Sequence, residues 1–179
     1  MFKKGCDIIR RNNNKIYISW DALKREINKQ RATGKKIILT SGTFDLLHPG
    51  HIHLLCAAKS FGDLLIVAVN SDDSVKRYKG HNRPINTLVD RMTVVAALEV
   101  VDYVALFSQD TPQVLIEYVQ PDILVKGGDY KKESIAGGGF VESHGGSVHV
   151  VEYLNQYSTT KMIRSIVAKK LTTCPKIIL

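Results

Sequence analysis

Cysteine is scarce in this sequence, and the few cysteines present form no recognisable pattern. Cys6, Cys56 and Cys174 lie far apart, are odd in number and include no C-x-x-C pair. The sequence therefore argues against a disulfide framework or a cysteine-ligated zinc site, and it favours a reducing compartment. Cys56 is surrounded by leucines and alanines, so we expect it to be a small residue of the core.

Long apolar runs are also absent from the sequence. No run approaches the roughly 20 residues that a membrane-spanning helix needs, and no apolar stretch follows the basic residues near the N-terminus. We therefore expect a cytoplasmic protein that does not bind membranes. At 179 residues the chain suits a single domain, with a core large enough to need neither disulfides nor metal.

Acidic residues are fewer than basic ones. The chain has 17 Asp and Glu against 25 Lys and Arg, which gives a formal net charge of +8. This balance favours anionic partners such as nucleotides, sugar phosphates or nucleic acid, and charge alone does not choose among them. Because no nucleic-acid-binding motif accompanies the charge, we expect no nucleic-acid partner.

Apolar periodicity divides the chain into alternating strands and helices. A polar segment, 1–18, precedes a helix over 20–33, for which Ser19 is the expected N-cap, and 173–179 form a C-terminal tail. The domain between them, 19–172, continues with strand 36–41, helix 50–61, strand 64–70, helix 87–98, strand 101–107, helix 111–119, strand 122–126, strand 147–151 and helix 158–170. Such alternation predicts an α/β fold whose mainly parallel sheet is covered by helices.

Several polar segments follow predicted strands. Ligands of such sheets gather at the carboxyl ends of the strands, so we expect these segments to converge on one crevice. They are His48, 70–79, 127–130 and 153–160. The glycines at 137–139 and 145–146 bracket a segment that we interpret as a flexible loop.

The segment from Thr40 to His51 is the strongest functional signal. It joins a glycine-containing turn, a carboxylate and two histidines, between an apolar run and a predicted helix. Peptide N–H groups at a helix start are unpaired and carry the positive end of the dipole, so they suit phosphate oxygens. A zinc site is disfavoured, because neither an H-E-x-x-H glutamate nor a cysteine pair accompanies the histidines. Two structural histidines would leave Gly42, Asp45 and Gly50 unexplained.

The pattern G-x-F-D-x-x-H-x-G-H, which runs from Gly42 to His51, resembles the signature of the nucleotidylyltransferase superfamily. The resemblance implies a single Rossmann-like α/β domain, with a doubly wound parallel sheet of about five strands and flanking helices. It also implies transfer of a nucleoside monophosphate to a phosphate ester, with release of pyrophosphate. His48 and His51 would donate hydrogen bonds to the α-phosphate and the leaving group as negative charge develops.

Further site residues follow from the same resemblance. The implied catalytic residues are His48, His51 and Lys79. The implied nucleotide-binding residues are Thr43, Phe44, Asp45, Gly50, His51, Gly127, Asp129, Ser158, Thr159 and Thr160. The implied ligands of the acceptor's phosphate are Arg91, Lys76 and Arg83.

Ordinary structural roles compete with some of these assignments. The stretch 70–80 also fits a solvated basic loop, and 127–130 also fits a simple turn. Ser158 is a good N-cap for the last helix, and its hydroxyl is equally suited to phosphate, so both roles can coexist.

One branch of the superfamily is the best match. The chain from about residue 20 to 170 looks like the D-glycero-β-D-manno-heptose 1-phosphate adenylyltransferases, which make ADP-heptose for the lipopolysaccharide inner core. This implies ATP as the nucleotide, Mg²⁺ as the cofactor, a sugar phosphate as the acceptor and a homo-oligomer, with a dimer favoured. The metal ligands are not assigned. The matching segments are 42–51, 69–72, 83–86, 110–112, 121–130 and 158–160.

Other functions remain open from the residues. Glycerol-3-phosphate cytidylyltransferase and archaeal-type FAD synthetase are similar. The former carries an arginine where this chain has Tyr153, and the latter tends towards G-Y-D where it has Gly127-Gly128-Asp129. A non-catalytic nucleotide-binding regulator and a basic nucleic-acid partner are the alternatives outside enzymology. Intact His48 and His51 argue against lost catalysis.

Overall fold

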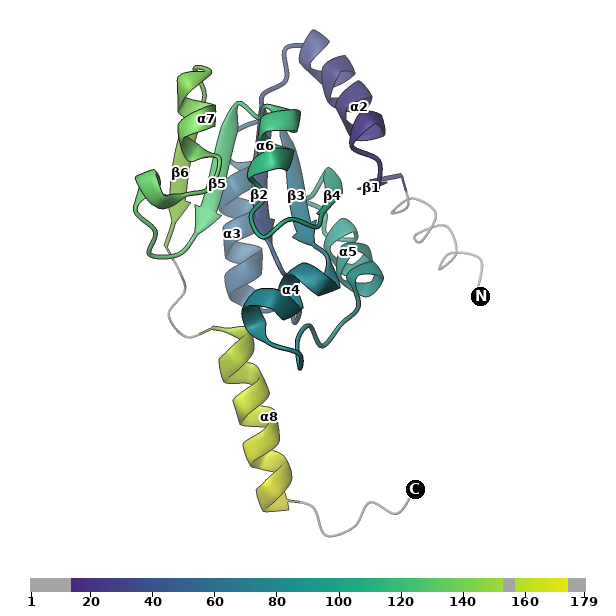
Figure 1. The fold of residues 1–179 in the computed structure, drawn as a ribbon, viewed down its shortest axis with the longest axis vertical. Helices are drawn as coiled ribbons and strands as arrows, with labels where there is room; N and C mark the ends of the chain where they lie inside the picture. Colours follow the sequence, from purple (N-terminus) through teal and green to yellow (C-terminus); the bar gives the residue numbers. More distant parts are fainter. Residues whose placement is uncertain (1–13, 153–156, 174–179) are drawn as a thin grey trace.

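A parallel sheet forms the centre of the protein (Figure 1). The computed structural model describes residues 14–152 and 157–173. Within them the sheet has six strands in the order β1-β4-β3-β2-β5-β6, and every neighbouring pair is parallel. The strands are β1 (Ile16–Tyr17), β2 (Ile37–Gly42), β3 (Leu64–Asn70), β4 (Tyr103–Phe107), β5 (Ile123–Gly127) and β6 (Ser147–Val151).

Helices cover both faces of the sheet. The face that buries Leu39 of β2 carries α2, α6 and α7, and the face that buries Ile38 carries α3 and α5. Neighbouring residues of a strand point to opposite faces, which explains why both are buried. The helices are α2 (Trp20–Ala32), α3 (Pro49–Lys59), α4 (Asp72–Lys79), α5 (Leu88–Ala96), α6 (Gln113–Val119), η1 (Lys132–Ser134), α7 (Gly138–Ser143) and α8 (Thr159–Thr173).

The direction in which the chain crosses the sheet reverses between β2 and β5. The connection after β2 passes over the α3 face, whereas the connection after β5 passes over the α7 face. The carboxyl ends of two such strands open a crevice between them. This confirms the predicted fold class, a Rossmann-like doubly wound α/β domain.

The N-terminal side of the sheet differs from the prediction. Ile16 and Tyr17 pair with Val104 and Ala105 of β4, so the sheet has six strands rather than about five and begins within the segment predicted to be polar. A two-residue edge strand is too short to produce a periodic signal. Residues 1–13 and 174–179, most of the predicted terminal segments, lie outside the described residues.

Two further predictions were wrong. The glycine-bracketed segment is the short helix α7 rather than a loop, because Val141 packs into the core and tertiary packing outweighs the low helix propensity of glycine. Cys56 is exposed rather than buried. α3 buries Leu55 and Ala58, which are three residues apart, and Cys56 lies off that face.

α8 extends away from the sheet (Figure 1). Most of its described side chains, from Thr160 to Lys169, are exposed, including Ile166 and Val167. In the described parts of the chain, we find no helix with the length and apolar character needed to cross a bilayer.

Candidate active site

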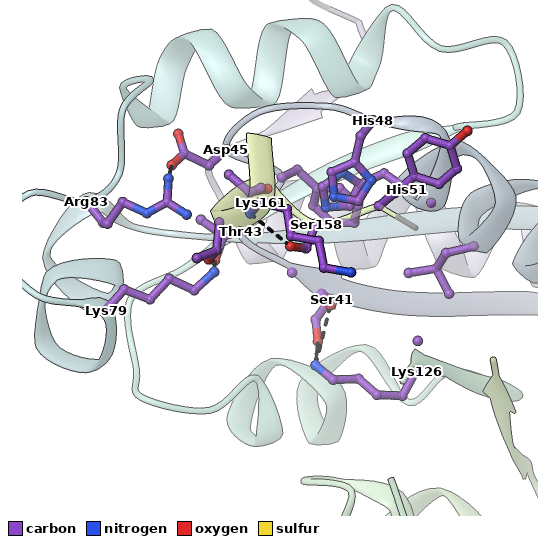
Figure 2. Close-up of a pocket in the computed structure, with 18 of the residues that line it drawn as sticks. Ser41, Thr43, Asp45, His48, His51, Lys79, Arg83, Lys126, Ser158 and Lys161 are labelled. Atoms are coloured by element: carbon purple, nitrogen blue, oxygen red, sulfur yellow. Dashed lines mark hydrogen bonds and ion pairs between the residues drawn. The ribbon is translucent and has the colours of Figure 1, made fainter. Parts of the chain in front are cut away.

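A cavity of about 680 Å³ opens at the carboxyl edge of the sheet, where β2 and β5 diverge (Figure 2). Of the residues predicted for the site, it brings together Thr43, Phe44, Asp45, His48, Gly50, His51, Lys79, Arg83, Gly127, Ser158, Thr159 and Thr160. The cavity is also lined by Ser41, Gly42, Leu54, Tyr78, Lys126, Tyr130, Tyr157 and Lys161, which the sequence did not single out as site residues.

The turn between β2 and α3 presents the two histidines. Phe44 adopts a left-handed conformation, φ 49°, and its side chain is buried in the core on the α3 side. His48 is the N-cap of α3, and Pro49 occupies the first turn, where the missing N–H costs little. The backbone N–H of His51 donates to the carbonyl of His48 at 2.9 Å. Because His48, Gly50 and His51 line the cavity, the start of α3 faces it with the positive end of the helix dipole.

The two imidazoles stack on each other beside the aromatic ring of Phe44. The centroids of His48 and His51 are 3.9 Å apart, and those of Phe44 and His51 are 5.2 Å apart. Burial, followed by the charges of His48 and Lys79, lowers the pKa of His51 to about 4. Burial also lowers the pKa of His48. Both rings are therefore neutral at pH 7, and each can donate one N–H without adding positive charge.

Gly50 leaves the space that the His48 ring occupies. A Cβ atom at Gly50 would lie 3.1 Å from two atoms of that ring and 3.5 Å from Cβ of Tyr157. The ring would have to shift to relieve this contact. Glycine therefore serves close approach of the ring here rather than an unusual backbone angle.

Lys79 reaches the cavity from the end of α4. Its Nζ donates to the hydroxyl of Thr43 at 3.1 Å, and that hydroxyl is 2.5 Å from the hydroxyl of Tyr78. Partial burial raises the pKa of Tyr78, but the hydrogen bond with Thr43 and the charge of Lys79 outweigh it, so the pKa is lowered. The predicted basic loop is thus a helix that ends with its lysine in the site, capped at its start by Ser71.

Lys126 is a site residue that the sequence analysis missed. Its Nζ lies 3.4 Å from the hydroxyl of Ser41 and 5.7 Å from the ring centroid of Tyr130 (Figure 2). Burial, partly opposed by Tyr78 and reinforced by Lys79, lowers its pKa. A lysine inside an otherwise apolar central strand was the available signal, because burying an unpaired ammonium is costly.

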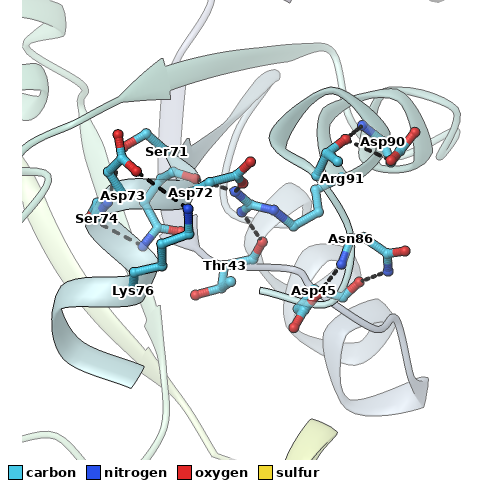
Figure 3. Close-up of polar contacts among 12 residues, drawn as sticks. Thr43, Asp45, Ser71, Asp72, Asp73, Ser74, Lys76, Asn86, Asp90 and Arg91 are labelled. Carbon is cyan, nitrogen blue, oxygen red and sulfur yellow. Dashed lines mark hydrogen bonds and ion pairs between the residues drawn. The ribbon is translucent and has the colours of Figure 1, made fainter. Parts of the chain in front are cut away.

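Asp45 lines the cavity but is already fully engaged. Its carboxylate accepts from Arg83 at 2.9 Å and from the backbone N–H groups of Ile85 and Asn86 at 2.9 Å, and Figure 3 shows the side chain of Asn86 beside it. Three donors on one buried carboxylate hold the 83–86 segment against the β2–α3 turn. Arg83 is therefore positioned at the cavity wall by Asp45.

Arg91 lies outside the cavity, in the core beneath it. Its side chain is 0 % exposed and donates to the carbonyls of Thr43 and Asn70 at 2.7 and 2.6 Å, and to the carboxylate of Asp72 at 2.9 Å (Figure 3). The guanidinium thus ties the end of β2 to the end of β3. The predicted contact with an acceptor phosphate remains a prediction.

Two other predicted residues are also not among those that line the cavity. The ammonium of Lys76 lies 3.6 Å from a carboxylate oxygen of Asp73 on the same helix, and Asp129 is exposed at the end of β5. A one-residue difference along a helix or strand decides whether a side chain faces a cavity or solvent. The predicted roles of Lys76 and Asp129 also stay predictions.

The start of α8 closes the opposite side of the cavity (Figure 2). The hydroxyl of Ser158 accepts from the backbone N–H of Lys161 at 3.1 Å, which confirms Ser158 as the N-cap. The hydroxyl of Thr159 donates to the carbonyl of Leu46 at 3.4 Å, and the ring of Tyr157 stacks on His48 with centroids 6.4 Å apart. Two helix starts therefore face one cavity, an arrangement suited to a polyphosphate.

A family model described as Cytidylyltransferase-like matches residues 39–165. The chain belongs to this family. The matched span runs from β2 into α8, so it contains both stacked histidines, the three lysines that line the cavity and the start of the last helix.

Individual relatives are considerably longer than the region they share with this chain. The chain is 53% identical over 150 residues to the Bifunctional protein HldE of Actinobacillus pleuropneumoniae, a match that covers 84% of this chain and 32% of the relative. It is 55% identical over 144 residues to the protein of the same name from Haemophilus influenzae, a match that covers 80% of this chain and 30% of that relative. The chain thus spans about a third of the length of these relatives.

A solved structure is also similar. The lipopolysaccharide core biosynthesis protein from Thermoplasma volcanium aligns with a TM-score of 0.56 at 30% sequence identity. The alignment covers 67% of this chain and 97% of that chain.

Proposed function

We propose that the protein is an adenylyltransferase that joins AMP from ATP to D-glycero-β-D-manno-heptose 1-phosphate, forming ADP-heptose and pyrophosphate. The convergence of two helix starts, two neutral histidines and three lysines on one cavity carries this proposal. The relatives named HldE and the lipopolysaccharide core biosynthesis protein support the choice of a sugar phosphate. With ATP as donor, the compartment that we propose is the cytoplasm.

The chemistry needs charge stabilisation more than proton transfer. An oxygen of the acceptor's phosphate attacks the α-phosphorus of ATP, the new P–O bond forms, and the bond to the bridging oxygen of pyrophosphate breaks with its electron pair leaving on pyrophosphate. Such a displacement is accelerated by aligning the two anions and by donors placed where charge develops. No covalent intermediate with the enzyme is required.

Different residues around the cavity stabilise different parts of the reacting substrates. His48 and His51, as neutral donors, stabilise the reacting α-phosphate, while the N–H groups at the start of α8 and the hydroxyls of Ser158 and Thr159 hold the leaving pyrophosphate. Lys79 offsets the negative charge that two approaching phosphates bring together. Thr43, which accepts from Lys79, keeps that ammonium at the cavity wall.

Magnesium enters this proposal as part of the MgATP substrate. Within the described residues, no group of three or more His, Cys, Asp or Glu side chains is arranged to hold a metal. Asp45 lines the cavity, but its oxygens already accept from Arg83 and two backbone amides. Mg²⁺ commonly keeps several waters and binds through substrate phosphates, so a metal carried by the triphosphate fits this donor set.

Product mass and pyrophosphate release test the proposal directly. The protein is incubated with heptose 1-phosphate and Mg²⁺, and with either ATP or CTP in otherwise identical reactions. We expect ADP-heptose from ATP and little product from CTP. CDP-heptose would overturn the choice of nucleotide. Failure with both, together with turnover of glycerol 3-phosphate or FMN, would move the protein to another branch of the family.

A homodimer is a further proposal that comes from the family resemblance. Light scattering coupled to size-exclusion chromatography measures it, with a mass near twice the 20.0 kDa of the chain as the expected result. A monomeric mass would contradict it without affecting the proposed reaction.

A further inference from the structure

A second cavity, of about 260 Å³, adjoins the first. Its lining extends from the ends of β3 and β4, through the loop before α6, to the segment that follows η1. The two cavities share the wall residues Ser41, Gly42, Tyr78, Lys126 and Tyr130. The second substrate of a transfer reaction has to reach the first cavity, and the two cavities adjoin at these shared residues.

Strand alternation places the second cavity on the other face of the sheet. Ser41 lies two residues after Leu39, and Lys126 lies two residues after Leu124, so both point to the face covered by α6 and α7. The histidines instead rise from α3 on the opposite face. The cavities therefore approach the strand ends from two sides and meet at Lys126.

The wall of the second cavity combines an apolar surface with neutral polar groups. The apolar part is Phe107, Pro112, Ile116, Leu124, Ile135 and Ala136. Thr111, Ser134 and Asn70 are its neutral polar residues; the hydroxyl of Ser134 donates to the carbonyl of Lys131, and the amide of Asn70 donates to Ser74 and Tyr78, so these two groups offer acceptor oxygens. A sugar presents both kinds of surface, because its C–H groups pack on apolar side chains while its hydroxyls need donors and acceptors.

Charge argues against a polyphosphate in this cavity. Asp110 lies in its wall and forms an ion pair with Arg77 at 2.6 Å, and no arginine is among the described residues that line this cavity. The histidines and the two helix starts all line the larger cavity. At about 30 Å³ for each water, 260 Å³ corresponds to roughly nine waters, which suits one sugar ring.

We propose that the second cavity binds the polyol part of the acceptor, with the acceptor's phosphate held at the shared wall by Lys126 and the hydroxyl of Tyr78. This inference rests on the proposed function and adds to it the site that selects the acceptor. Figure 2 shows Lys126 and Ser41 on one side of the site, with the histidines and Ser158 on the other. An acceptor phosphate at Lys126 thus approaches ATP from the side away from the start of α8, as an in-line displacement requires.

Filling the cavity is the first test. Ala136 lines the second cavity and not the first, so Ala136→Phe places a ring where the sugar would bind. We expect the KM for heptose 1-phosphate to rise about tenfold or more and the KM for ATP to change by less than about twofold. Val114→Phe is the matched control, because Val114 is half-exposed on α6 and lines neither cavity.

Removing one hydroxyl is the second test. Thr111→Val keeps the shape of the side chain, and we expect the KM for the acceptor to rise about fivefold with ATP binding unchanged. ATP affinity is measured for every variant by calorimetry without acceptor. If Ala136→Phe fails to bind ATP because it misfolds, Thr111→Val alone decides. A normal KM for the acceptor, or a raised KM for ATP in folded variants, would overturn the proposal.

Failure of the proposed reaction is distinguishable from failure of this inference. If the wild-type protein transfers to another phosphate ester, the same variants are assayed with that ester, and the same changes in KM are expected. If it transfers to none, binding of heptose 1-phosphate is compared by calorimetry between wild type and Ala136→Phe. Binding lost only in the variant supports the cavity, whereas equal binding or no binding to the wild type overturns it.

Discussion

The two helix starts that face the large cavity are held in place very differently. α3 packs on the sheet and buries Leu55 and Ala58. α8 extends away from the sheet, and most of its described side chains are exposed. Among the contacts that join its start to the rest of the protein are the hydrogen bond from Thr159 to Leu46 and the stacking of Tyr157 on His48.

This difference separates a half of the site that rests on the core from a half that is mostly exposed, and we expect the order of the exposed half to depend on the ligand. The histidine side rests on buried packing and on the guanidinium of Arg91, so its donors are in place before substrate binds. Most described side chains of α8 are exposed, and segments with few buried contacts open at low free-energy cost. We therefore expect substitutions on the two sides to have effects of different size and kind.

The largest effect is expected where the preorganised half is joined to the core. Arg91→Met leaves Asp72 and two buried carbonyls without their donor, so we expect a loss of about 3 to 5 kcal/mol in the free energy of unfolding. Urea denaturation measures it. Lys76→Met, on the exposed side of α4, is the control, with a change within about 0.5 kcal/mol. A stable Arg91→Met protein with only a raised KM for the acceptor would instead favour the phosphate contact predicted from the sequence.

His51→Ala tests the chemistry of the same half. Removing one preorganised donor should lower kcat on the order of a hundredfold or more while the fold is retained. Steady-state turnover and a thermal melt measure the two effects. His53→Ala on the same helix is the control, because His53 is exposed and does not line the cavity. Near-normal turnover of His51→Ala would refute the role proposed for this side chain.

A substitution in the half of the site formed by α8 should lower activity less than His51→Ala does. Ser158→Ala removes the N-cap of α8 and one hydroxyl, so we expect about 1 kcal/mol of lost helix stability and about a tenfold fall in kcat/KM for ATP. Ser165→Ala, on an exposed part of α8, controls for general effects on the helix. An effect as large as that of His51→Ala would show that both halves are equally preorganised.

Ligand dependence can be observed directly by hydrogen exchange. We expect MgATP to slow amide exchange in the first turns of α8 more than in α3, because α3 is packed on the sheet whereas most described side chains of α8 are exposed. Mass spectrometry of peptides from the two helices, with and without MgATP, makes the comparison. Equal protection in the free protein would remove the distinction between the halves.

A further effect concerns the pH dependence of stability. The pKa of His51 in the folded protein is about 4, below the 6.5 of an exposed histidine, so between these values the unfolded state binds more protons. Stability from this residue is present above pH 6.5 and is lost as pH falls through about 4. His51→Phe should flatten the fall of stability in that window, measured by urea denaturation at several pH values. An unchanged slope would mean that the pKa of His51 is not lowered.

Local patterns predicted much of this molecule. Continuous apolar runs located β3 and β5, and the glycine, aspartate and histidine spacing located the β2–α3 turn. Such features depend on neighbours in the sequence, which is why they can be read without a structure. The edge strand β1 and the helix α7 could not be read in this way, because long-range packing stabilises them.

The site shows the same division. The motif pattern and the family resemblance singled out His48, His51, Lys79 and Ser158 as candidate site residues, and all four line one cavity in the structure. The burial of Arg91 in the core and the position of Lys126 between both cavities became visible only in the folded structure. The reason is physical: whether a cation faces solvent, substrate or a buried carbonyl depends on segments that lie far away in the chain and pack around it.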